Sequence, residues 1–326
     1  MKRILLIMLC LALALSTSAC AKSAGEDDVV IYASSEDFRN DAFLERLYAE
    51  FPDYNIMLQY LPTGNNAAKL LAEGKDTECD IVLALDSAYM EQISGILTDL
   101  SDYDDSAYMD EMKVGSRKYM VWEKYSGCII LNRAILDAKG LPAPESYDDL
   151  LNPIYKELVV MPNPKSSGTG YFFLKNMINV RGEAEAFAYF DRLAENVLQF
   201  TSSGSGPVNM LSQGEAAIGL GMVFQAVNAI NDGNDLDIVF FEEGSPYSTS
   251  GYGMIEGKQD RAAVREVFDF FCSDLIHMDK ELFSPDQIFK GQANTVDNYP
   301  TDVKYADMRG IEDIDEKLRI LEEWEH

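Results

Sequence analysis

A loop at residues 162–171 holds the residues with the clearest capacity for chemistry, because it is rich in serine, threonine and glycine. It follows an apolar, strand-like run at 158–161 and leads into a run with helical periodicity at 170–180. Hydroxyls donate hydrogen bonds, glycines let backbone amides approach a ligand, and a helix N-terminus carries a partial positive charge. The loop therefore predicts an anion-binding site, although the same residue types also form ordinary caps and turns. Its candidate ligand-binding residues are Ser166, Ser167, Gly168, Thr169 and Gly170.

A second loop at 200–207 has the same composition, and Pro207 suits the first turn of a helix. The first loop lacks the Gly-Lys-Ser/Thr ending of a nucleotide P-loop, so ATP binding is not predicted. Further polar residues follow apolar runs in the first half of the chain. Ligands of open α/β sheets bind beyond the carboxyl ends of strands, so we expect both sets to line one cleft. The additional candidates are Ser34, Ser35, Thr63, Gly64, Asn65, Asp86, Ser126, Ser202, Ser203, Gln225, Glu243 and Tyr247.

One arginine lies close to these loops. Arg39 follows Ser35 by four residues and is a candidate for a bidentate phosphate contact; a solvated position on a helix is the alternative. Glu243 or Asp86 is expected to hold an ammonium group or sugar hydroxyls.

Alternating strand and helix patterns predict the elements that position these loops. The spacing of apolar residues predicts two α/β lobes, each a mainly parallel sheet flanked by helices. Lobe 1 is expected to comprise 29–124 and 250–326, because the last segment has no complete sheet of its own, and lobe 2 to comprise 125–249. The connecting strands would cross between the lobes and form a hinge. The predicted strands are 29–33, 55–60, 80–85, 158–161, 216–221 and 238–241.

The N-terminus has the features of a secretory signal. Lys2 and Arg3 precede an apolar run at 4–15, and small residues lead to Cys20. The run is shorter than the roughly 20 residues that a membrane span needs. We expect a signal peptide at 1–19 and a polar tether at 20–28, with Cys20 lipidated, since the site is similar to a bacterial lipobox. Cleavage that leaves Cys20 free is the alternative. The mature protein would lie on the outer face of the cell membrane, or in the periplasm if an outer membrane exists.

Composition argues against several classes of function. The net charge is −28, and nucleic-acid binding needs a clustered basic surface instead. His277 and His326 lie in no metal-binding spacing, so neither catalysis nor a metal or cofactor is predicted. Cys79, Cys128 and Cys272 are far apart and would form either one disulfide or three buried thiols.

The order of several segments resembles the type II periplasmic-binding-protein fold of extracellular solute-binding proteins. The resembling segments are 31–35, 79–82, 129–133, 162–171, 214–219 and 243–246. This resemblance implies a monomer that captures a small solute in an interlobe cleft, closes by a hinge motion and delivers the solute to ABC permease and ATPase subunits. An exported enzyme or a sensor on the same scaffold is a distant alternative.

The resemblance also narrows the range of expected ligands. Ferric-iron binders of this family typically present adjacent tyrosines, and this chain has no Tyr-Tyr pair. Polyamine binders need carboxylates and an aromatic cage, but the serine and glycine loops have the wrong polarity. The residues available for such a cage are Glu36, Asp86, Trp122, Glu123 and Glu243. Thiamine would need an aromatic sandwich that cannot be assigned. The loops look most like those of the phosphonate and sugar-phosphate branch, so we expect a small anionic or zwitterionic solute.

Overall fold

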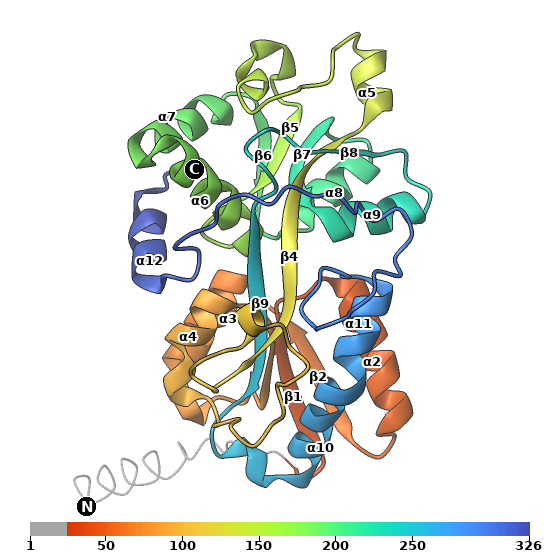
Figure 1. The fold of residues 1–326 in the computed structure, drawn as a ribbon, viewed down its shortest axis with the longest axis vertical. Helices are drawn as coiled ribbons and strands as arrows, with labels where there is room; N and C mark the ends of the chain where they lie inside the picture. The colour runs from red at the N-terminus through yellow and green to blue at the C-terminus, as the bar shows by residue number, and fades with distance from the viewer. Residues whose placement is uncertain (1–24) are drawn as a thin grey trace, which may run out of the picture.

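The structure is a computed structural model that describes residues 25–326. The expected signal peptide, the lipidation site Cys20 and most of the expected tether lie outside the described residues. Within them, two α/β lobes lie end to end and are joined by two long strands (Figure 1). These strands are β4 (Met120–Leu131) and β9 (Tyr247–Met254), which pair antiparallel from Met120 opposite Tyr252 to Ser126 opposite Tyr247.

The sheet of lobe 1 has parallel strands at its centre. β1 pairs parallel with β2 and β3, and β9 joins β3 antiparallel. β3 is buried along its whole length, as expected of a strand covered by helices on both faces. The strands are β1 (Asp28–Ala33), β2 (Asn55–Tyr60) and β3 (Ile81–Asp86), and the helices between and after them are α2 (Asp37–Glu50), α3 (Thr63–Glu73) and α4 (Ser87–Gln92).

The sheet of lobe 2 is built around the second half of β4. β7 and β8 pair antiparallel with β4, whereas β5 pairs parallel with both β6 and β7. The strands are β5 (Val159–Pro162), β6 (Val197–Thr201), β7 (Ile218–Met222) and β8 (Asp237–Val239). The helices are α5 (Arg133–Ala138), α6 (Gly168–Arg181), α7 (Glu183–Ala194), α8 (Gly206–Ser212) and α9 (Val223–Asn231).

The C-terminal helices pack against both lobes. α10 (Ala262–Phe270) and α11 (Ile276–Leu282) bury Val264, Phe268 and Ile276 in the core of lobe 1. The chain then returns across the molecule, and α12 (Ile314–Glu323) lies beside α6 and α7 (Figure 1). Trp324 packs edge-on against Phe190 at 5.4 Å between ring centroids, inside the core of lobe 2.

The expected assignment of all of 250–326 to lobe 1 stays a proposal, because α12 contacts α4 of lobe 1 while Ile320, Leu321 and Trp324 pack in the core of lobe 2. The irregular segment before α12 crosses from one lobe to the other, so this helix lies where the two lobes meet (Figure 1). The other expected boundaries, after residues 124 and 249, fall inside β4 and β9, so a division of the chain at these points stays a proposal.

The described cysteines form no disulfide with one another. Cys79 and Cys128 are buried free thiols and Cys272 is a half-buried one, so the alternative of separate thiols is correct for this part of the chain. Burial raises the pKa of Cys272 to about 12. No helix among residues 25–326 has the length and apolar character to span a bilayer.

Replacing Trp324 by alanine tests the placement of α12. The side chain is 1% exposed, and truncating a buried tryptophan typically costs about 3–5 kcal/mol of unfolding free energy. Leu318→Ala, on α12 itself at 38% exposure, is the control and should change stability by less than about 0.5 kcal/mol. Urea denaturation measures both, and equal losses from the two variants would contradict the packing of α12 on lobe 2.

Candidate ligand-binding site

A cavity lies between the two lobes, and its lining comes from both of them. Lobe 1 supplies strand-end and helix-start residues, the crossing strand β4 supplies two side chains, and lobe 2 supplies the two serine-rich loops. The lining residues are Ser34, Glu36, Tyr60, Pro62, Thr63, Ala84, Glu123, Tyr125, Ser166, Ser167, Gly168, Thr169, Ser203, Gly204, Ser205 and Met222.

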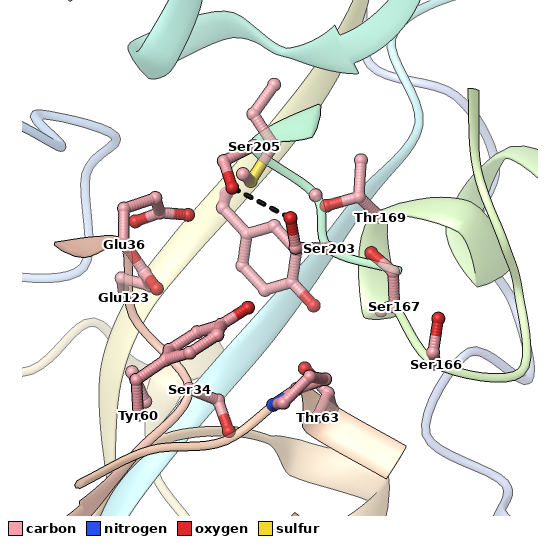
Figure 2. Close-up of a pocket in the computed structure, with 16 residues that line it drawn as sticks. Ser34, Glu36, Tyr60, Thr63, Glu123, Ser166, Ser167, Thr169, Ser203 and Ser205 are labelled. Carbon is pink, nitrogen blue, oxygen red and sulfur yellow. Dashed lines mark hydrogen bonds between the residues drawn. The ribbon is translucent and has the colours of Figure 1, made fainter. Parts of the chain in front are cut away.

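The wall from lobe 2 presents neutral hydrogen-bond donors. Ser167 caps α6 and its hydroxyl accepts a hydrogen bond from the N–H of Gly170 at 3.5 Å. The first N–H groups of a helix have no partner four residues earlier, so those of Gly168 and Thr169 are free of intrahelical bonds. Figure 2 shows Ser166, Ser167 and Thr169 together on this wall. The arrangement suits an oxyanion.

The second loop of lobe 2 adds two hydroxyls to the same cavity. Ser203 and Ser205 are hydrogen-bonded to each other, with 2.9 Å between their Oγ atoms (Figure 2). Gly204 brings this loop against α6, because a Cβ atom there would lie 2.6 Å from the Oγ1 atom of Thr169. The close approach therefore requires glycine and gathers three hydroxyl groups in one region.

The wall from lobe 1 and β4 carries two carboxylates. Glu36 Oε2 accepts a hydrogen bond from Arg39 at 2.9 Å, and Glu123 Oε2 accepts one from Arg39 at 2.7 Å. Glu123 Oε1 accepts from the Ser250 hydroxyl at 3.1 Å. Burial raises the pKa of Glu36 above its ordinary value, against the opposing effect of the Arg39 guanidinium.

Arg39 is a structural cation and not a ligand contact in this structure. Its side chain is fully buried, and Asp279 accepts from its Nε and Nη2 atoms, each at 2.9 Å. The guanidinium also lies over the ring of Phe224, 5.0 Å from its centroid. The expected phosphate contact and the alternative of a solvated position are both wrong, because three carboxylates surround this guanidinium.

Tyr125 joins the cavity lining to a second buried ion pair. Its hydroxyl donates to Asp86 Oδ2 at 3.2 Å, and Asp86 Oδ1 accepts from Lys317 of α12 at 2.6 Å. Asp86 also accepts from Ser248 at 3.1 Å. The prediction that Asp86 contacts the ligand is therefore not supported by its position, since its carboxylate is used by these neighbours.

Ala84 lines the cavity in an unusual backbone conformation. Its φ is +54°, in the left-handed region that favours glycine, and the pairing of β3 with β9 shifts register around it. Non-glycine residues in this region tend to occur at functional sites, where surrounding structure holds the strained backbone.

The cavity gathers part of the set that the sequence analysis singles out. Ser34, Thr63, Ser166, Ser167, Gly168, Thr169 and Ser203 line it, and their binding role stays a prediction. The lining does not include Ser35, Gly64, Asn65, Asp86, Ser126, Gly170, Ser202, Gln225, Glu243 or Tyr247.

Each of these ten residues has a different position or partner. Hydroxyls are engaged elsewhere, as for Ser35, which donates to Asn40 at 2.5 Å, and Ser126, which donates to Asp286 at 3.0 Å. Three other side chains have partners or positions outside the cavity. Glu243 lies 3.6 Å from Arg181, and Tyr247 packs on Tyr305. Gln225 is buried in α9. Asn65 and Ser202 are exposed, and Gly64 and Gly170 pack against backbone. The Asp86 carboxylate accepts hydrogen bonds from Tyr125 and Lys317.

Tyr60 and Tyr125 line the cavity but are not among the ligand-binding candidates of the sequence analysis. Glu36 and Glu123 are considered there only for a polyamine. Tyr60 ends β2, and Glu36 directly follows the strand-end serines, so both lie where ligand contacts are expected. Glu123 and Tyr125 alternate on β4 and so share one face of the strand, a spacing that signals a common site. No group of three or more histidine, cysteine or acidic residues within 25–326 is arranged to hold a metal ion.

Sequence comparison finds a matching protein family and several similar proteins. The sequence model of the bacterial extracellular solute-binding protein family matches residues 79–305. An uncharacterized protein of Haemophilus influenzae is 27% identical over 265 residues, covering 77% of this chain and 73% of that protein. The phosphoglycerate transport regulatory protein PgtC of Salmonella typhimurium is 25% identical over 180 residues, covering 50% of this chain and 44% of PgtC.

Solved structures share the fold. The periplasmic binding protein AfuA from Actinobacillus pleuropneumoniae, with exogenous fructose-6-phosphate bound, has a TM-score of 0.79 at 21% identity and covers 91% of this chain and 97% of its own. Apo ferric ion-binding protein A of Pasteurella haemolytica has a TM-score of 0.69 at 15% identity, with coverages of 91% and 97%. The α/β fold expected from the sequence is confirmed by these matches.

Substituting Arg39 tests its role in holding the carboxylates. Arg39→Met leaves buried carboxylates without their cation, which typically costs about 3–5 kcal/mol of unfolding free energy. Arg46→Met is the matched control, since Arg46 lies on the same helix and pairs with Asp274 at 2.8 Å on the exposed surface, where such pairs contribute little. Thermal unfolding measures both variants. A stable Arg39→Met protein would contradict the assignment.

Proposed function

Because this chain belongs to the family of bacterial extracellular solute-binding proteins, we propose that it captures a small phosphorylated or phosphonate solute in the interlobe cavity. The bound solute is delivered to the permease and ATPase subunits of an ABC importer. The protein acts as a monomeric receptor without catalytic activity. Its Cys20 anchor places it on the outer face of the cell membrane, or in the periplasm where an outer membrane exists.

The observation that carries this proposal is the wall of neutral donors from lobe 2. It combines the hydroxyls of Ser166, Ser167 and Thr169 with the start of a 14-residue helix. An oxyanion bound there accepts several hydrogen bonds and lies at the positive end of the helix dipole.

Two relatives support a phosphorylated ligand. PgtC is named for phosphoglycerate transport, and the AfuA structure contains fructose-6-phosphate. Neither fixes the ligand of this chain, since the identities are 25% and 21%.

Ferric iron is the main alternative, because ferric-binding proteins share the fold and the cavity contains two tyrosines. These tyrosines are not adjacent in the sequence, and the described lining contains no histidine. Tyr125 is also hydrogen-bonded to Asp86. These features favour an oxyanion over a metal ion.

Closure follows from the two crossing strands. β4 and β9 connect the lobes, so a hinge motion about them opens and closes the cavity. The lobes touch at the cavity rim, where Gly64 N–H donates to Ser166 O at 3.5 Å. The closed form is the one that the permease recognises.

Removing two hydroxyls tests the anion site. Ser166→Ala combined with Thr169→Ala should weaken binding at least tenfold, because the oxyanion loses two donors. Ser202→Ala is the control, since Ser202 is exposed and lies outside the cavity lining. Calorimetry with 2-aminoethylphosphonate, glucose 6-phosphate, fructose 6-phosphate, ferric citrate, thiamine and spermidine identifies the ligand and measures the loss. Binding of the cations alone would overturn the proposal.

Adding a methyl group at Gly64 tests the closed contact. An ideal Cβ atom at this position would lie 2.5 Å from the backbone oxygen of Lys165, so Gly64→Ala should hinder closure and weaken ligand binding at least tenfold. Gly95→Ala is the control, because a Cβ atom there meets nothing within 4 Å. Small-angle scattering with saturating ligand should show compaction for wild type and Gly95→Ala but less for Gly64→Ala. Equal compaction and affinity in all three proteins would contradict the closed contact.

A further inference from the structure

The acidic end of the cavity carries one carboxylate more than it has cations. Glu36, Glu123 and Asp279 surround Arg39, and Lys280 donates to Asp279 at 2.7 Å. These groups are nearly all buried: the side chains of Arg39, Asp279 and Lys280 are at most 3% exposed. Three carboxylates thus share two cations in a region from which water is largely excluded.

Glu36 is the member of this cluster with an oxygen left for a ligand. Both oxygens of Glu123 accept hydrogen bonds, from Arg39 and from Ser250. Both oxygens of Asp279 accept from Arg39, and one of them also accepts from Lys280. By contrast, among residues 25–326 only Arg39 donates a side-chain hydrogen bond to Glu36, and it does so to Oε2. The Oε1 atom of Glu36, a residue that lines the cavity, is therefore unpartnered by any described side chain.

The cavity is consequently bipolar. In Figure 2, Glu36 and Glu123 lie on one side, and Ser166, Ser167 and Thr169 lie on the opposite side. No lysine, arginine or histidine within 25–326 is part of the lining. A phosphate dianion alone would add charge to a cluster that is already net negative, with only neutral donors to compensate it, and uncompensated buried charge is costly.

We infer that the solute is a zwitterion: a phosphonate or phosphate monoester that carries a protonated amine, with the ammonium paired to Glu36 and the oxyanion held by the lobe 2 hydroxyls. An ammonium group supplies the missing positive charge and donates to the oxygen of Glu36 that has no side-chain partner. Sugar hydroxyls satisfy the hydrogen bond but leave the charge unbalanced. This inference rests on the proposed function, and it assigns Glu36 as the residue that selects for the amine.

Two pairs of compounds that differ in the amine test the inference by calorimetry. The pairs are 2-aminoethylphosphonate with ethylphosphonate, and glucosamine 6-phosphate with glucose 6-phosphate. The amine-bearing member of any pair that binds should bind at least tenfold more tightly than its partner. An amine-free member that binds equally well or better overturns the zwitterion while leaving the proposed function intact. If none of the four binds below 1 mM, the proposed function fails and the inference fails with it.

The Glu36→Gln variant tests whether Glu36 causes the preference for amine-bearing compounds. The amide has the same shape but no charge, so it should weaken binding of the amine-bearing compound at least tenfold and change binding of its amine-free partner less than threefold. Asp37→Asn is the matched control, since it removes one negative charge at the neighbouring, exposed residue. Thermal unfolding confirms that both variants are folded. A Glu36→Gln protein that keeps the full preference for the amine overturns the assignment.

Discussion

The buried guanidinium of Arg39 is the interaction on which both the core of lobe 1 and the cavity depend. Through its carboxylate partners it links α2 with β4 and α11, and through Phe224 it touches lobe 2. A buried charge is stable only when oppositely charged groups and hydrogen bonds compensate it. Moving α2, β4 or α11 away from the others would remove a carboxylate from Arg39, so these three elements are held together. The position of the acidic wall is thus set by the packing of the core, before any ligand is present.

The two lobes contribute opposite chemistry to one cavity. Lobe 1 and β4 supply carboxylates, whereas lobe 2 supplies hydroxyls and the N-terminus of α6. For the proposed bipolar solute, neither wall alone would contact both ends, so full recognition would require both lobes to be in place. A ligand that contacts both walls at once binds the closed arrangement more tightly than the open one. It therefore shifts the equilibrium between the two toward the closed arrangement.

The sequence predicted the parts that depend on local patterns. The strands at 29–33, 55–60 and 80–85 appear with nearly those bounds, the serine-rich loops follow β5 and β6, and the resemblance to solute-binding proteins is confirmed. It could not predict the role of Arg39, whose partner Asp279 is 240 positions away. The use of Asp86 by Lys317, 231 positions later, was equally hidden. Such partners are set by tertiary packing, which periodicity along the chain does not encode.

The placement of α12 gives the lobes a third connection besides β4 and β9. Trp324 fixes the end of this helix in lobe 2, while Lys317 reaches Asp86 of lobe 1 through an ion pair in which both side chains are 1% exposed. A rotation that separated α12 from Asp86 would let water reach both charges, which offsets much of the attraction lost. The helix therefore links the lobes through a contact that can be broken. The stability of that contact depends on how completely water is excluded from the ion pair.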